Sequence, residues 1–196
     1  MKISKMTKIT KHYDKYFQQK DALVLHPYSE EAIHIDTLLY KPTELYPFWK
    51  LATMGASDYA MHGNNSLGNR NEYMLFIDPS VDMNDKEIAI KYYDILIWTA
   101  FFALKNNDFI SYGHSIELAD KNNTAVAGIY LEMPQAIMDT GILRCKLSPF
   151  KKAICLQVIP LDMQALNQLM KVGSEEFSYT YIYPEEDKES HWLCKL

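Results

Sequence analysis

The chain is organised around residues 32–61, which read AIHIDTLLYKPTELYPFWKLATMGASDYAM. Apolar residues dominate two runs in this stretch, 33–40 and 48–54, and a short polar segment with prolines separates them. Such a pattern predicts two antiparallel strands joined by a turn. Residues 54–58, Met-Gly-Ala-Ser-Asp, then predict a sharp elbow after the second strand. We therefore expect a sheet that begins with this hairpin.

Polar side chains gather around the predicted hairpin and elbow. His34 and Asp36 are two positions apart in the first strand, so their side chains point to the same face. Gly55 supplies the conformational freedom that a turn needs, and Ser57 and Asp58 follow it. We expect His34 and Asp36 to brace the elbow through buried hydrogen bonds. Asp58 is expected to accept hydrogen bonds from free N–H groups of the turn.

Hydrophobic periodicity predicts the remaining elements. The predicted helices span 5–19, 84–105 and 163–172, and the predicted strands span 22–27, 72–77, 126–133, 141–147, 153–159 and 177–183, with an extended stretch at 109–116. The second helix is expected to start at a capping box formed by Asn84 and Glu87. Its second half is apolar nearly all round, so we expect it to be buried across the sheet. In the third helix Asp162 is the expected N-cap and Gly173 the expected end.

Together these elements predict an α+β fold, with a mixed, mostly antiparallel sheet packed against helices. A length of 196 residues suits one domain with a full core, and we see neither a linker nor a repeat, so residues 1–196 are expected to form a single domain. Residues 185–196 are charged at first and are expected to form a loosely held tail.

Composition restricts the classes of partner and the location. A formal net charge of −5 disfavours nucleic acid, because phosphate binding needs a basic face, whereas a basic protein would be attracted. The longest apolar run, 95–104, is about half of a membrane span. The N-terminal residues lack the apolar core of a secretory signal. We therefore expect a cytoplasmic protein that binds neither nucleic acid nor a membrane.

The three cysteines, Cys145, Cys155 and Cys194, show no spacing that is typical of a metal site. We expect them to be buried free thiols in a reducing compartment. A disulfide between Cys145 and Cys155 is the alternative, because both lie on strands that are expected to be neighbours.

Several motifs resemble the suppressor-of-fused domain family. They are His34-Ile-Asp36, Lys41-Pro-Thr-Glu44 with Pro47-Phe48, Leu51–Met61, Glu72–Ile77, a long helix with Trp98, Tyr112-Gly-His-Ser115 followed by Ile116, and Gln157–Leu161. The string Thr-Met-Gly-x-Ser-Asp with an upstream His-x-Asp is the most specific combination. The resemblance covers roughly residues 20–175 and implies a suppressor-of-fused-like single domain. The tyrosine alternation after Gly173 departs from the helix that the family implies there.

The resemblance also implies a function, which is non-enzymatic binding of another protein. Larger animal members of the family hold a transcription factor between this domain and a second one, and we do not carry that mode over to a single domain. Single-domain bacterial members resemble immunity proteins that neutralise a partner toxin. An acidic chain with 14 tyrosines is compatible with such a role, since tyrosine provides contact area and acidic groups attract a basic toxin.

The candidate site residues have two interpretations. As structural or recognition residues they are His34, Asp36, Gly55, Ser57, Asp58, Tyr112, Gly113 and His114. The alternative is a metal-dependent hydrolase that uses His34, Asp36, Asp58 and His114, with Ser57 as the candidate nucleophile. The chain contains neither HExxH nor GxSxG, so we favour the first interpretation and expect no catalytic residue, no metal and no cofactor.

A second candidate surface lies in the predicted strand 177–183. Tyr179, Tyr181 and Tyr183 alternate with smaller or polar residues, so they would share one face of that strand. If that face is exposed, it is a candidate partner surface. The alternative is an edge strand whose tyrosines pack on the core.

Overall fold

The computed structural model describes residues 3–26, 33–63, 66–106, 108–118, 126–184 and 190–196. Pro27, the expected end of the first strand, and residues 185–189 of the expected tail lie outside the described residues.

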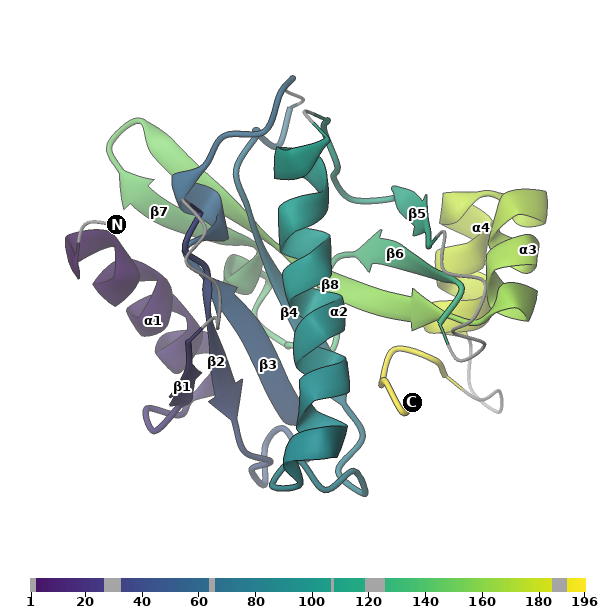
Figure 1. The fold of residues 1–196 in the computed structure, drawn as a ribbon, viewed down its shortest axis with the longest axis horizontal. Coiled ribbons are helices and arrows are strands. Elements are labelled where there is room, and N and C mark those ends of the chain that lie inside the picture. The colour runs from purple at the N-terminus through teal and green to yellow at the C-terminus, as the bar shows by residue number, and fades with distance from the viewer. Residues whose placement is uncertain (1–2, 27–32, 64–65, 107, 119–125, 185–189) are drawn as a thin grey trace.

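Helices and strands are distributed along the whole described chain (Figure 1). The helices are α1 (Ile3–Phe17), α2 (Lys86–Lys105), α3 (Met163–Val172) and α4 (Ser174–Phe177). The strands are β1 (Leu23–Leu25), β2 (Asp36–Tyr40), β3 (Trp49–Met54), β4 (Asn71–Ile77), β5 (Ser115–Glu117), β6 (Gly128–Glu132), β7 (Arg144–Ser148) and β8 (Lys151–Leu161). Three further helical turns are η1 (Ala56–Asp58), η2 (Thr140–Leu143) and η3 (Ser178–Ile182).

The strands form one sheet in the order β1-β2-β3-β4-β8-β6-β5, and β7 pairs with β8 outside this path. Strands β4 and β8 are parallel, with Glu72 opposite Cys155, and the other named strand pairs are antiparallel. The predicted hairpin is present, since β2 and β3 pair with Asp36 opposite Met54. The prediction of a mixed, mostly antiparallel α+β sheet is therefore confirmed.

Each face of the sheet packs into a separate hydrophobic core, because successive side chains along a strand point to opposite faces. On β4, Tyr73 and Leu75 belong to the cluster that contains the buried residues of α2, whereas Met74 and Phe76 belong to the cluster that contains those of α1. This alternation explains why β4 is apolar without interruption from Tyr73 to Ile77, because a strand covered on both faces has no solvent side.

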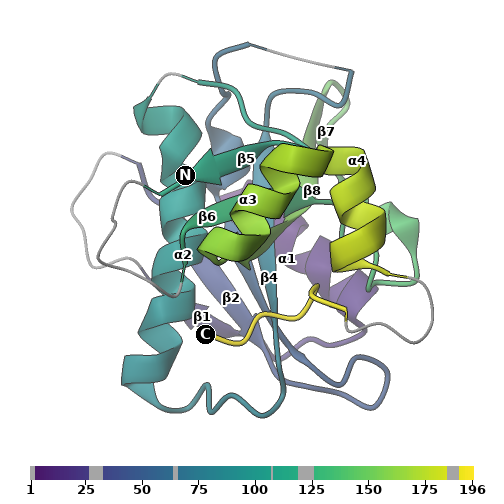
Figure 2. The same cartoon turned by 90° about the vertical axis from the view of Figure 1, so that its right-hand side faces the viewer.

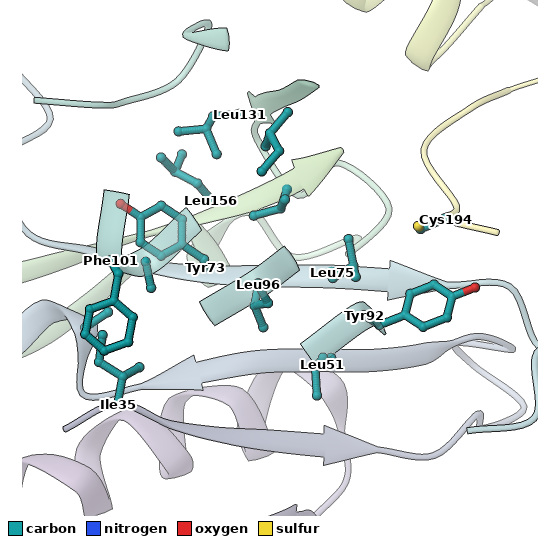
Figure 3. Packing of buried hydrophobic residues seen from close by; sticks show 14 of the residues in the cluster. Ile35, Leu51, Tyr73, Leu75, Tyr92, Leu96, Phe101, Leu131, Leu156 and Cys194 are labelled. Carbon is teal, nitrogen blue, oxygen red and sulfur yellow. The ribbon is translucent and has the colours of Figure 1, made fainter. Parts of the chain in front are cut away.

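Helix α2 covers one face of the sheet, as Figure 1 shows. Its residues Tyr92, Leu96 and Ala100 are spaced by four and are buried, so they form one stripe toward the sheet. Figure 3 shows Tyr92 and Leu96 of this stripe near Leu51 and Leu75 of the central strands. The predicted position of this helix across the sheet is confirmed, but its burial is limited to one face, since Ile90 and Trp98 are 47% and 39% exposed. No helix in the described ranges is long and apolar enough to cross a membrane.

The two helix starts that the sequence predicted differ in their outcome. For α2 the cap is Asp85 rather than Asn84, because the Asp85 carboxylate accepts hydrogen bonds from the backbone N–H groups of Glu87 and Ile88. For α3 the prediction is confirmed, since Asp162 accepts a hydrogen bond from the backbone N–H of Ala165.

Beyond Gly173 the predicted strand 177–183 is wrong. The chain continues as α4 and η3, which pack beside α3 at one end of the sheet (Figure 2). Residues four apart are neighbours on a helix, and Phe177 stacks on Tyr181 with ring centroids 4.7 Å apart. The alternating aromatic residues therefore fit both a strand, with its period of two, and a helix, in which residues four apart are neighbours. The helix is favoured because it buries Phe177 and Ile182 together with residues of α3.

Two smaller corrections concern the strand at 141–147 and the tail. Residues 140–143 form η2, so the strand begins only at Arg144. Residues 190–196 are held in place: the backbone N–H of Cys194 donates to the carbonyl of Phe76, and the Trp192 ring packs edge-on against Phe48. The expectation of a loosely held tail is therefore wrong for these residues.

The cysteines are free and buried, as expected. In the antiparallel register of β7 and β8, Cys145 lies opposite Ala153 rather than opposite Cys155.

Candidate functional site

The elbow after β3 is built around a buried carboxylate. Glu72 on β4 is fully buried, and its Oε1 accepts hydrogen bonds from the backbone N–H of Gly55 at 3.1 Å and from the backbone N–H of Ser57 at 3.0 Å. The hydroxyl of Ser57 donates to the same oxygen at 2.6 Å, and the hydroxyl of Thr53 donates to Oε2 at 2.6 Å. Burial raises the pKa of Glu72 to about 6, and the hydrogen bonds from Ser57 and Thr53 oppose this rise.

Backbone geometry and a cation complete the elbow. Gly55 has φ 117° and ψ −11°, a conformation that a residue with a side chain rarely adopts, so the predicted need for glycine is confirmed. Arg70 donates from Nη1 to the backbone carbonyls of Ser57 and Asp58 at 2.8 and 2.7 Å. The acceptor of the elbow's N–H groups at Gly55 and Ser57 is thus Glu72 rather than Asp58.

His34 and Asp36 meet at the start of β2, together with a histidine that the sequence reasoning did not select. Asp36 is completely buried, and its Oδ1 lies 2.9 Å from Nε2 of His34 and 2.9 Å from Nδ1 of His26. The other carboxylate oxygen, Oδ2, is buried and has no hydrogen-bond partner in the described part of the chain. Among the described residues these three form the one group of histidine, cysteine and carboxylate side chains close enough to hold a metal ion.

The hydrolase alternative required four ligands, and two of them are not in this group. Neither Asp58 nor His114 joins the described cluster of His26, His34 and Asp36. The candidate nucleophile Ser57 is also enclosed, because it is 1% exposed and its hydroxyl donates to the Glu72 carboxylate. The side chains around the elbow therefore support the turn and do not present a nucleophile to solvent.

The other predicted candidates lie in a turn that packs on α4. Gly113 has φ 80°, and the backbone N–H of His114 closes the turn onto the carbonyl of Ser111. A side chain at Gly113 would come within 3.5 Å of the Ser174 hydroxyl, so the turn lies directly beside the start of α4. The Tyr130 hydroxyl donates to the carbonyl of Ser174 and so holds the first residue of α4 in place.

This packing brings two separately predicted sets of residues into one surface. Burial raises the pKa of the Tyr112 hydroxyl, and Glu132, Tyr179 and Glu175 raise it further, which places these groups within electrostatic range of one another. We call the exposed and half-buried residues of this region the aromatic–acidic surface, and they are Tyr112, His114, Glu175, Glu176 and Tyr179.

Only one of the three predicted tyrosines presents its ring fully at this surface. Tyr179 is 66% exposed. Tyr181 is half-buried between Phe177 and His191, and Tyr183 donates its hydroxyl to Oε1 of Gln157 at 2.9 Å. The shared face expected for the three tyrosines is therefore absent, because the segment is helical.

Sequence reasoning missed three residues that determine these sites. Glu72 was assigned to a central strand without a role, although a carboxylate inside an apolar run signals a buried polar function. Arg70 lies directly before the same strand and was given no role. His26 directly follows β1, and its position opposite Asp36 depends on a strand register that cannot be derived from residue spacing.

The fold and the sites define the protein as an α+β domain with two features. A buried carboxylate braces the elbow at one end of β4, and the aromatic–acidic surface lies beside α4. The family model described as suppressor of fused protein (SUFU) matches residues 31–182. The chain therefore belongs to the suppressor-of-fused family, a family of non-enzymatic protein-binding domains.

Solved structures with the same fold include three relatives. A suppressor-of-fused homologue from Neisseria gonorrhoeae has a TM-score of 0.65 at 9% identity, with 90% of this chain and 88% of that chain covered. A Sufu–Fu complex gives 0.60 at 9% identity, covering 88% and 81%. Drosophila Suppressor of Fused gives 0.54 at 14% identity, covering 86% of this chain and 44% of that one. No curated protein matches the chain in sequence.

Proposed function

We propose that this chain neutralises a partner protein by direct binding, and that it serves as the immunity protein of a bacterial toxin–immunity pair. Family membership supports protein binding, and one of the structural relatives is a complex of Sufu with Fu. The observation that carries the proposal is the aromatic–acidic surface, where the turn that contains Tyr112 packs against α4.

The chemistry of this surface fits a basic protein partner. Tyr179 offers a large ring at low entropic cost, because tyrosine has few rotatable bonds to immobilise. Glu175 and Glu176 are exposed on the adjacent turn of α4 and would attract lysine or arginine side chains. The net charge of −5 adds a long-range attraction for a basic toxin.

The backbone under this surface is fixed before a partner binds. Ser178 donates its hydroxyl to Oε2 of the buried Glu132 at 2.5 Å, and the Tyr130 hydroxyl holds the carbonyl of Ser174. Phe177 is fully buried beneath the same turns. A surface that is already ordered loses little conformational entropy on binding, which favours tight neutralisation.

A cytoplasmic location is part of the proposal. The three buried free thiols are typical of a reducing compartment, and an immunity protein has to meet its toxin where the toxin would act.

Co-expression with the product of the neighbouring reading frame tests the proposal. We expect the two proteins to copurify and the growth arrest caused by the toxin to be relieved. Glu175→Lys/Glu176→Lys and Tyr179→Ala are each expected to weaken the complex by tenfold or more, since a buried anchor contributes about 1–2 kcal/mol or more.

The matched control is Phe150→Ala, an aromatic residue that is 98% exposed in the turn between β7 and β8, away from α4 (Figure 1). This variant should bind like the unaltered protein. Absence of a complex and of growth rescue would refute the immunity role. A complex that keeps its full affinity after the substitutions at Glu175, Glu176 and Tyr179 would refute the assigned surface.

A further inference from the structure

We propose that His26, His34 and Asp36 form a binding site for a divalent transition-metal ion of the zinc class at the outer edge of the sheet. One ring nitrogen from each histidine and one carboxylate oxygen of Asp36 lie within 4.8 Å of one another. This site is separate from the aromatic–acidic surface, and its existence does not depend on the proposed neutralisation of a toxin.

The sheet itself brings the three residues together. Strand β1 pairs antiparallel with β2, with Leu25 opposite Thr37, and continuing this register places His26 opposite Asp36. His34 is two positions before Asp36, so its side chain shares the same face. One cross-strand neighbour and one same-face neighbour therefore converge on a single carboxylate.

The distances are close to those of a coordination shell. In a tetrahedral zinc site with bonds of roughly 2.0–2.1 Å, adjacent ligand atoms are about 3.3 Å apart. Both histidine nitrogens lie 2.9 Å from Oδ1 of Asp36, so two edges of the shell are almost at the required length. The third edge joins the two histidine nitrogens, which lie within 4.8 Å of each other, and small rotations of the two exposed rings would adjust this distance.

The burial pattern also favours a cation over a simple hydrogen-bond network. Both histidine rings contact Oδ1, while Oδ2 of the fully buried Asp36 has no hydrogen-bond partner among the described residues. A buried carboxylate oxygen without a partner is costly, and a metal ion coordinated by both oxygens of this carboxylate would offset that cost. The histidine side chains are 69% and 48% exposed, so an ion can reach the site from solvent.

The ligand types select the class of ion. Imidazole suits zinc and its neighbours among the transition metals, whereas magnesium and calcium prefer oxygen ligands. Three protein ligands leave a fourth position toward the solvent side, as in zinc sites that bind water or an external group. The ion would join the end of β1 to the start of β2 and stabilise this edge of the sheet.

Metal analysis and thermal unfolding of the untagged protein test the site. After incubation with zinc and desalting, we expect one zinc ion per chain. Zinc at a hundredfold excess over its dissociation constant should raise the melting temperature by about 5–10 °C. Magnesium at the same concentration should leave the melting temperature unchanged.

His26→Ala is the decisive variant, because this side chain is mostly exposed and its loss should leave the fold intact. We expect it to lose the bound zinc and the thermal shift, and His34→Gln to do the same. His62→Ala replaces an exposed histidine outside the cluster and outside the aromatic–acidic surface, so it is the matched control and should keep both. The proposal is overturned if the unaltered protein retains no zinc, or if His26→Ala responds to zinc as the unaltered protein does.

Discussion

Replacing Glu72 by glutamine would test whether the elbow rests on a buried, titrating carboxylate. Glutamine has nearly the same shape, so its Oε1 can still accept from Gly55 and from Ser57. Its amide group replaces Oε2, and the Thr53 hydroxyl then loses its acceptor. The substitution therefore removes the titration and one hydrogen bond while leaving most of the elbow in place.

The magnitude follows from the pKa of Glu72. The folded chain raises this pKa from the ordinary value of 4.5 to about 6, mainly through burial. The folded state then binds the proton more tightly than the unfolded state does, so the resulting stability is complete below pH 4.5 and is lost as the pH rises through 6. At 1.4 kcal/mol per pH unit, the loss amounts to about 2 kcal/mol.

The assay is denaturant unfolding of the unaltered protein and of Glu72→Gln at several pH values between 4 and 7. All other titrating groups are common to both proteins, so the difference between their free energies of unfolding isolates Glu72. We expect that difference to shift by about 2 kcal/mol in favour of the variant from pH 4 to pH 7. A difference that stays constant over this range would refute the reasoning.

A matched variant separates charge from structure. Glu72→Ala leaves the N–H groups of Gly55 and Ser57 and the hydroxyl of Thr53 without an acceptor. Each unsatisfied buried donor costs about 1–3 kcal/mol, so this variant should lose about 3 kcal/mol or more at every pH at which the chain folds.

Two further predictions concern backbone strain and a buried lysine. Gly55→Ala should lower the free energy of unfolding by about 1–3 kcal/mol, because φ 117° is strained for alanine, and thermal unfolding would measure it; an unchanged melting temperature would contradict the strain. Lys50 is buried and donates to the carbonyl of Lys41, and burial lowers its pKa to about 8. The folded state therefore binds this proton less tightly than the unfolded state does, so the free energy of unfolding should increase as the pH rises from 8 toward 10.5. Lys50→Met should remove this dependence, and an unchanged pH profile in the variant would disprove the assignment.

The parts of the fold that sequence could predict are those set by local patterns. The β2–β3 hairpin followed from two apolar runs around a proline-containing turn, and the position of α2 across the sheet followed from its apolar second half. The need for Gly55 followed from a short elbow of small residues. Each of these depends on neighbours within a few positions along the chain.

What could not be predicted depends on long-range register. Asp36 was expected to brace the elbow, yet it faces His26 across the edge of the sheet, and Glu72 from another strand braces the elbow instead. The contact of Asp36 with His26 and that of Glu72 with the elbow both join separate strands, and neither can be derived from the spacing of residues along the chain. The helical segment formed by α4 and η3 was missed for a different reason, since the spacing of Phe177 and Tyr181 fits both the two-residue period of a strand and the four-residue spacing of a helix.

The position of β8 in the sheet has a consequence for how the chain assembles. This strand pairs with β4, β6 and β7, and its contact with β4 joins residues as distant as Asn71 and Ile154. The hairpins β1–β2–β3–β4 can form while the ribosome is still synthesising the chain, but β4 keeps an unpaired edge until residues 151–161 emerge. Contacts of such high sequence separation form slowly, so we expect the docking of β8 to limit the rate of folding and the β4 edge to stay exposed until that docking is complete.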